Sequence, residues 1–205
     1  ETSLRDRLGY RTPEALAGAL AATGFTSANL SFDLGCGTGL MGDVLGDRAG
    51  QIEGVDLSAR MISIAREKGR YRRLVVGDLI DFLAVPGDPP DLIVAADVLN
   101  YVGALDPVFR AARARLAPGG RFALSLERHD GPEEIVVGDS LRFRHNGAAA
   151  RRAAENAGFS VLGFEDSVLR EDRGLPVRGY LMVLGRSEEH TSELQSCGLI
   201  SYAVF

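Results

Sequence analysis

Residues 30–39 read LSFDLGCGTG, and this stretch decides the fold. An apolar run of strand length ends at Asp33-Leu34, and glycines then stand at alternate positions, Gly35, Gly37 and Gly39, before a helical stretch. Glycine permits a sharp turn and lets the backbone lie against a ligand, because no Cβ occupies that space. The N-terminus of the following helix offers unpaired N–H groups. The stretch predicts a strand–loop–helix unit that can hold a ligand, although a plain tight connection would also use these glycines.

The same alternation of strand and helix continues along the chain. Apolar runs of strand length occupy residues 29–34, 51–55, 73–76, 91–95 and 121–126. Helical stretches lie between them at residues 40–47, 59–68, 79–83 and 105–116. Upstream, residues 13–22 predict a helix with Thr12 as its N-cap and Pro13 at its first position. The strand runs are apolar throughout, which is typical of parallel strands covered on both faces. We therefore predict an α/β fold with a doubly wound, Rossmann-like architecture.

The pattern changes after the fifth strand. Residues 135–137 and 141–144 predict a short hairpin, and residues 148–157 predict a helix. Residues 160–169 and 177–184 are separated by turn residues, so they predict an antiparallel hairpin at the edge of the sheet. This C-terminal hairpin would complete a mostly parallel sheet of seven strands.

The composition excludes several classes of protein. The 205 residues, of which 45% are hydrophobic and 25% charged, fit one globular domain. The sequence has no apolar stretch long enough for a membrane span and no secretory signal. A net charge of −5 argues against a nonspecific nucleic-acid binder. We expect a cytoplasmic protein without nucleic-acid or membrane partners. The composition leaves the oligomeric state unknown.

The last twenty residues differ from the rest. Residues 186–196, RSEEHTSELQS, and the segment after them resemble the translation of a common short-read sequencing adapter. A natural polar tail is the alternative. We expect residues 1–185 to form the domain and residues 186–205 to be a non-native tail. Excluding the tail removes Cys197, so no pair of cysteines remains.

Acidic residues stand at the ends of four predicted strands: Asp33, Asp56, Asp78 and Asp97. Open α/β sheets bind ligands at the carboxyl ends of their strands, and an acid after the second strand accepts hydrogen bonds from ribose hydroxyls. Asp56 is in that position, and Asp78, after the third strand, is suited to the exocyclic amine of an adenine. A helix N-cap is the plain alternative for any one of these acids. Four together favour a nucleotide site.

At this point the sequence resembles a known family. Residues 10–185 are similar to class I S-adenosylmethionine-dependent methyltransferases, on five motifs: residues 32–39 (FDLGCGTG), 54–58 (GVDLS) with Met61, 77–78 (GD), 91–99 (DLIVAADVL) and 116–120 (LAPGG). The chain resembles in particular a bacterial group of methyltransferases often fused to tetratricopeptide repeats. Residues 10–13 (YRTP) and 168–171 (VLRE) carry that likeness, and no such repeat is visible in the sequence.

The resemblance implies S-adenosylmethionine as the cofactor and a role for each matched position. The methionine moiety would be held by Gly35, Gly37 and Asp33, the ribose by Asp56, the adenine by Leu57, Met61, Asp78 and Leu79, and the amino group and transferred methyl would lie near Asp97. Tyr10, Cys36 and Gly39 complete the expected cofactor site. No basic neighbour in the sequence marks Cys36 as a nucleophile, and we expect no metal site.

A small molecule is the expected methyl acceptor. Transfer from a sulfonium needs alignment and proximity, with a general base only if the acceptor must lose a proton. Residues 128–147 interrupt the alternation of strands and helices, and such insertions at the ligand edge build substrate pockets. We predict that Tyr10, Tyr101 and His145 line the acceptor pocket, with His145 as the candidate proton acceptor.

Two alternatives remain open. A nicotinamide-dependent oxidoreductase would also place glycines after strand one and an acid after strand two. Gly37, Gly39 and Gly42 formally give its glycine fingerprint, but the first glycine after the strand is Gly35, so the register is wrong. The other alternative is a noncatalytic module that binds S-adenosylmethionine without turnover.

Overall fold

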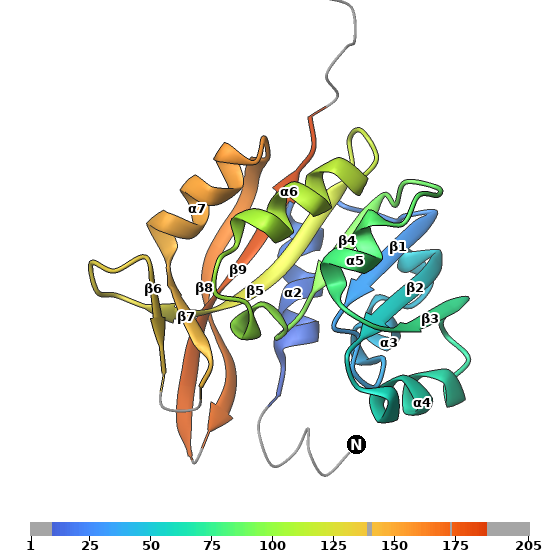
Figure 1. The fold of residues 1–205 in the computed structure, drawn as a ribbon, viewed down its shortest axis with the longest axis horizontal. Coiled ribbons are helices and arrows are strands. Elements are labelled where there is room, and N and C mark those ends of the chain that lie inside the picture. Colours follow the sequence, from blue (N-terminus) through green and yellow to red (C-terminus); the bar gives the residue numbers. More distant parts are fainter. Residues whose placement is uncertain (1–9, 139–140, 173, 188–205) are drawn as a thin grey trace, which may run out of the picture.

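The computed structural model describes residues 10–138, 141–172 and 174–187 (Figure 1). The strands are β1 (Leu30–Leu34), β2 (Gln51–Asp56), β3 (Arg73–Val76), β4 (Leu92–Ala95), β5 (Arg121–His129), β6 (Ile135–Val137), β7 (Phe143–Asn146), β8 (Ser160–Asp172) and β9 (Leu175–Gly185). The α-helices are α2 (Thr12–Ala22), α3 (Leu40–Leu45), α4 (Ala59–Glu67), α5 (Leu79–Ala84), α6 (Asp106–Arg115) and α7 (Gly147–Asn156). Two 3₁₀ turns, η1 (Gly46–Ala49) and η2 (Leu99–Tyr101), link them.

Strands β3, β2, β1, β4 and β5 lie side by side in that order and are parallel throughout. Strand β9 pairs antiparallel with β5, and β8 pairs antiparallel with β9. These seven strands confirm the predicted mostly parallel sheet with its C-terminal antiparallel hairpin. Because the parallel strands share one direction, the loops after β1, β2, β3 and β4 meet at one edge of the sheet.

Apolar side chains cover both faces of the sheet. On β5, Phe122 and Leu124 pack in a core with α5, α6 and α7, while Ala123 packs in a second core with α2 and α3. Neighbouring residues of a strand point to opposite faces, so the two cores lie on opposite sides of the sheet. Figure 1 shows α5 and α6 in front of the sheet. The two-sided covering explains why the parallel strands read as unbroken apolar runs.

A short hairpin extends the end of β5. Strands β6 and β7 pair antiparallel, and β7 pairs parallel with β5 through Arg128 opposite His145. The hairpin predicted from the sequence is confirmed, with its second strand at Phe143–Asn146 rather than at residues 141–144. It brings the segment predicted to form the acceptor pocket to the carboxyl edge of the sheet.

Three local predictions need correction or refinement. Thr12 is the first residue of α2 rather than its N-cap, because its buried hydroxyl donates to the Leu169 carbonyl at 2.7 Å instead of capping the helix. Helix α3 ends at Leu45, because Gly46 adopts a positive φ of 57° and the chain continues as a 3₁₀ turn. Arg186, assigned to the tail, pairs its backbone with Gly119 and Gly120 at 2.9 Å.

Residues 188–205 lie outside the described residues. None of the helices in the described part of the chain is long and apolar enough to cross a membrane.

Candidate functional site

The glycine loop joins β1 to α3 at the carboxyl edge of the sheet. Gly35, Gly37 and Gly39 have φ values of 65°, 53° and 86°, in the left-handed region that favours glycine. A Cβ on Gly35 would meet Val98 Cγ2 at 2.4 Å, so this glycine is required by packing. A Cβ on Gly37 would meet no atom within 4 Å. The loop therefore packs inward at Gly35 and faces open space at Gly37, where a ligand has room.

Asp56 braces this loop from the end of β2. One carboxylate oxygen accepts a hydrogen bond from the Gly37 N–H at 2.9 Å, and the other accepts from the Ser58 N–H at 2.8 Å. Asp56 is partly exposed. A carboxylate oxygen can accept more than one hydrogen bond, so Asp56 can brace the loop and still meet ligand hydroxyls.

Asp33 lies beneath the loop and is almost fully buried. It accepts a hydrogen bond at 2.6 Å from the hydroxyl of Tyr71, which the sequence analysis did not identify. Burial raises the pKa of Asp33 from 3.8 to about 7; the Tyr71 hydrogen bond lowers the pKa and the nearby Asp56 raises it. The Tyr71 ring would lie within 3.0 Å of a Cβ on Gly39, so it also supports the second half of the loop.

Cys36 also points into the protein. Its side chain is buried, and burial raises the pKa of its thiol, with the charges of Asp33 and Asp56 acting in the same direction. The thiol is therefore held in its neutral, unreactive form.

Exposed apolar side chains gather after β2 and β3. Leu57 is 77% exposed, Met61 on α4 is 39% exposed, and Val76 at the end of β3 is also exposed. Asp78 is the N-cap of α5, where its side chain accepts hydrogen bonds from the N–H groups of Ile80 and Asp81. A helix N-cap is the alternative role that the sequence left open for an acid at the end of a strand. Leu79 is partly buried beside it. An apolar surface next to acids suits a flat, polar-edged ring such as a purine.

Asp97 follows β4 in a strained conformation, with a φ of 55° that L-residues other than glycine rarely adopt. Its N–H donates to the Ser125 hydroxyl at 2.8 Å, and its carboxylate lies 3.6 Å from Arg170 and 3.4 Å from the Thr12 hydroxyl. Burial raises the pKa of Asp97, and the charge of Arg170 offsets part of that effect. Burial also raises the pKa of Tyr10, and Asp97 adds to that increase, which places the Tyr10 hydroxyl in the electrostatic environment of Asp97.

The two residues expected in the acceptor pocket differ in accessibility. Tyr101 is 60% exposed, whereas His145 is 1% exposed. The His145 Nε2 lies 3.0 Å from the Gly103 carbonyl and so donates to it, which leaves Nδ1 as the basic nitrogen. Nδ1 is buried and has no hydrogen-bond partner among the described residues, and burial lowers the pKa of the ring. This placement argues against the expectation that His145 takes a proton from an acceptor and favours a role in holding β7 against the chain at Gly103.

A buried ionic cluster, which no sequence motif indicated, lies beside Asp97. Glu127 on β5 accepts hydrogen bonds from Arg170 on β8 and from the Asn100 amide at 3.1 Å. Burial raises the pKa of Glu127, but the hydrogen bonds from Arg170 and Asn100 and the charges of Arg170 and Arg142 outweigh it, so the net pKa lies below its usual value. The residues of this cluster are far apart in the sequence, and β8 joins β5 in the sheet only through β9. No local sequence pattern therefore indicates the cluster.

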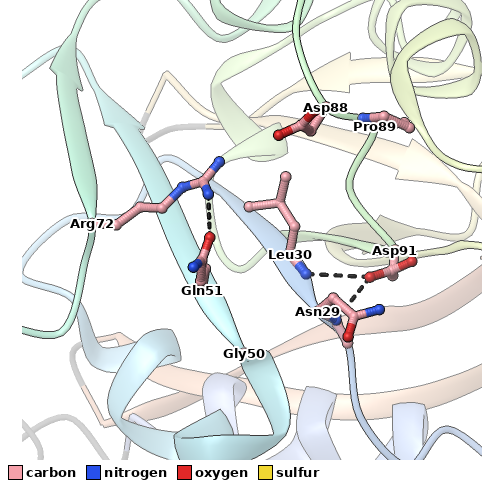
Figure 2. A pocket seen from close by; sticks show the side chains of 9 residues that line it. Asn29, Leu30, Gly50, Gln51, Arg72, Asp88, Pro89 and Asp91 are labelled. Atoms are coloured by element: carbon pink, nitrogen blue, oxygen red, sulfur yellow. Dashed lines mark hydrogen bonds between the residues drawn. The ribbon is translucent and has the colours of Figure 1, made fainter.

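A surface cavity of about 590 Å³ lies at the opposite end of the sheet (Figure 2). Its lining comes from residues at the start of β1 and β2 and just before β3 and β4. There Asp91 accepts hydrogen bonds from the Asn29 and Leu30 N–H groups at 2.7 and 3.2 Å, and Arg72 donates to Gln51. The cavity therefore belongs to the amino ends of the strands and not to the candidate site.

The described residues contain no cluster of three acidic, histidine or cysteine side chains that could hold a metal ion.

Parts of the chain are similar to known methyltransferases. Residues 32–122 match a family model described as a methyltransferase domain. Over 109 residues the chain is 34% identical to trans-aconitate 2-methyltransferase of Paracidovorax citrulli, covering 52% of this chain and 42% of that protein. Over 142 residues it is 31% identical to ribosomal RNA small subunit methyltransferase C of Chromohalobacter salexigens, covering 60% of this chain and 41% of that protein. The chain thus spans about two fifths of the length of these relatives.

A solved structure shows the same fold over most of the chain. The crystal structure of magnesium protoporphyrin IX methyltransferase from Synechocystis PCC 6803 with bound S-adenosylmethionine aligns with a TM-score of 0.64 at 21% identity. The alignment covers 86% of this chain and 79% of that one. The fold shared with this structure and the family match are both consistent with a ligand site at the glycine loop. Residues 32–122 thus match a methyltransferase-domain model, and the chain has the same Rossmann-like α/β fold as that solved structure.

Proposed function

We propose that this chain is an S-adenosylmethionine-dependent methyltransferase that acts on a small-molecule acceptor. The observation that carries the proposal is the glycine loop, which faces open space at Gly37 and is braced by Asp56. The exposed apolar surface of Leu57 and Met61 lies beside it for an adenine. The methyltransferase-domain match over residues 32–122 supports this reaction class over a nicotinamide-dependent oxidation.

The proposed cofactor site uses both backbone and side chains. Its residues are Tyr10, Asp33, Gly35, Cys36, Gly37, Gly39, Asp56, Leu57, Met61, Asp78, Leu79 and Asp97. Asp33 and Cys36 have buried side chains, so they contribute loop backbone rather than side-chain contacts. Asp56 would bind the ribose hydroxyls, and Asp97 would lie near the amino group and the transferred methyl.

The proposed mechanism rests on alignment. S-adenosylmethionine, when bound, supplies a methyl group on a positively charged sulfur that leaves as a neutral thioether. The glycine loop would hold the methionine moiety and Asp56 the ribose, and Asp97 would lie near the amino group and the transferred methyl. Alignment of reacting atoms alone can supply about 7–11 kcal/mol of a barrier. Since His145 is buried, with Nε2 bonded to Gly103 and Nδ1 enclosed by the protein, the proposed mechanism uses no histidine base.

The acceptor is proposed to lie over the ends of β4 and β5, next to Tyr101. One relative is a trans-aconitate methyltransferase, which favours a small acid as a first acceptor to try. The net charge of −5 supports a small-molecule acceptor over RNA. We also propose that the domain works in the cytoplasm and that residues 188–205 are not part of it.

Calorimetry with S-adenosylmethionine, S-adenosylhomocysteine and NAD tests the cofactor. We expect micromolar binding of the first two and none of NAD; the opposite order would refute the proposal. An assay that detects S-adenosylhomocysteine release from trans-aconitate and other small acids tests turnover. Cofactor binding without release from any acceptor would support the noncatalytic binding module instead.

A further inference from the structure

The carboxyl edge of the sheet has two chemically different halves. Over β2 and β3 it is apolar and acidic, with Leu57, Met61 and Asp56. Over β5 and β7 it is rich in arginine. Here we call Arg142, Arg144 and Arg170 the arginine cluster; all three surround the buried carboxylate of Glu127.

The arginine cluster carries more charge than its acids neutralise. Arg142 and Arg144 lie 3.5 and 3.7 Å from Glu127 oxygens, and Arg170 donates to Glu127 and lies 3.6 Å from Asp97. Among the described residues, three guanidinium groups thus share two carboxylates. Arginine stays protonated at any working pH, so the cluster keeps a net positive charge when both acids are ionised.

Buried polar atoms in this cluster have hydrogen-bonding capacity left over. Among the described residues, Arg170 Nη1, Asn100 Oδ1 and Asp97 Oδ1 are buried without a hydrogen-bond partner. Unsatisfied buried groups are uncommon in native proteins and are typical of sites that bind water or a ligand. Arg170 and Asn100 are both more than nine-tenths buried. Of the three atoms, only Arg170 Nη1 is a donor, so it is the one whose remaining capacity suits an anion.

Tyr101 and Arg142 form the accessible wall of the cluster. The Arg142 guanidinium lies 5.4 Å above the Tyr101 ring and donates to the Tyr101 hydroxyl at 3.0 Å. Stacking and hydrogen bonding fix the orientation of a guanidinium, and its planar fork matches a carboxylate or phosphate. Arg144 is more exposed and offers a second guanidinium nearby.

We propose that the arginine cluster binds an anionic group, a carboxylate or a phosphate, on the methyl acceptor. The inference rests on the proposed function, because it takes the β2 half of the edge as the nucleoside site and leaves the β5 half for the acceptor. Arg142 and Arg144 make the direct contacts, and Arg170 holds Glu127 and Asp97 in place behind them. The anion would lie on the same edge of the sheet as the positively charged sulfonium, which would favour its binding when S-adenosylmethionine is present.

The test compares acids with neutral molecules of the same shape. Ligand-observed NMR titrations of the full chain saturated with S-adenosylhomocysteine measure dissociation constants for 4-hydroxybenzoate, 4-hydroxybenzamide and inorganic phosphate. The variants are R142Q and R144Q. R152Q is the matched control, because Arg152 lies on α7 outside the cluster and pairs with Glu134. Thermal melting checks that each variant is folded, and calorimetry measures S-adenosylhomocysteine affinity.

We expect the acid to bind at least about tenfold more tightly than the amide, and R142Q to weaken the acid by about 10- to 100-fold. R152Q should leave both unchanged. Phosphate binding that R142Q abolishes, with no binding of the acid, supports a phosphate-bearing acceptor. Equal binding of acid and amide without phosphate binding overturns the inference, as does an acid preference that both variants retain. If R142Q weakens S-adenosylhomocysteine instead, the cluster holds the cofactor's own carboxylate and the inference is also wrong. If the parent chain fails to bind S-adenosylhomocysteine, the proposed function fails, and the acid–amide comparison on the unliganded chain still tests the cluster.

Discussion

Replacing Asp56 with alanine tests the candidate cofactor site where its geometry is best defined. The carboxylate accepts hydrogen bonds from the Gly37 and Ser58 N–H groups at 2.9 and 2.8 Å. A hydrogen bond to a charged group contributes about 1.5–3 kcal/mol when it is protected from water. Asp56 is partly exposed, so water replaces part of each lost bond. We expect the free energy of unfolding to fall by about 1–3 kcal/mol.

The loss of cofactor affinity should exceed this loss of stability. Asp56→Ala removes two proposed ribose contacts, together worth about 3–6 kcal/mol, so the dissociation constant should rise by about 10²- to 10⁴-fold. Calorimetry with S-adenosylhomocysteine measures the affinity, and thermal melting followed by circular dichroism measures the stability. Asp47→Ala is the matched control, because it removes an exposed carboxylate from η1, before β2, and should leave affinity unchanged.

The ribose contact can be separated from the brace on the glycine loop. Adenosine and 2′-deoxyadenosine differ by one hydroxyl, so the parent chain should prefer adenosine and Asp56→Ala should lose that preference. A variant that binds S-adenosylhomocysteine as tightly as the parent refutes the assignment of Asp56. A variant that binds more weakly but keeps its preference for adenosine shows that Asp56 only supports the loop.

Three further predictions concern the loop, its buried acid and the tail. Gly37→Val should abolish S-adenosylhomocysteine binding in calorimetry, because its side chain enters the open space proposed for the ligand. Gly35→Ala should chiefly lower the melting temperature, because its Cβ meets Val98 at 2.4 Å, and the reverse pattern would contradict the loop geometry. The raised pKa of Asp33, about 7, means that the folded state loses stability as the pH rises from about 4 to 7. The free energy of unfolding of Asp33→Asn, measured with denaturant, should therefore rise by about 1–3 kcal/mol relative to the parent between pH 5 and 8, and a constant difference would refute this. A chain ending at Ser187 should keep the parent's melting temperature, and a large decrease would show that the tail is native. A chain ending at Gly185 lacks the two backbone hydrogen bonds of Arg186, so its free energy of unfolding should fall by about 1–3 kcal/mol.

The parts of the fold that follow from local pattern could be predicted from the sequence. The parallel strands are buried on both faces and therefore read as unbroken apolar runs, and the structure has strands at all five of them. The glycine loop was recognisable because its backbone geometry admits few other residues. Thr12 was misassigned because a hydroxyl suited to an N-cap instead bonds to Leu169, a partner that only the folded chain brings near.

The side-chain pairs between distant elements of the candidate site could not be predicted in the same way. Tyr71 reaches Asp33 from 38 positions away, and Arg170 reaches Glu127 from 43 positions away. Neither pair leaves a periodic signal, because each depends on side chains from separate elements. His145 drew attention as one of few histidines, yet composition says nothing about burial, and its ring lies inside the protein.

The position of β9 in the sheet also bears on the order in which the protein can assemble during synthesis. This strand follows all the other described strands in the chain, yet it lies between β5 and β8 and pairs with β5 from Arg121 to Glu127. Until it leaves the ribosome, that edge of β5 has no partner and can pair with other chains. Arg170 sits on β8, which is anchored to the sheet through β9. The nucleoside half of the molecule can therefore form on the ribosome, whereas the arginine-rich half is completed only when the last strand is released.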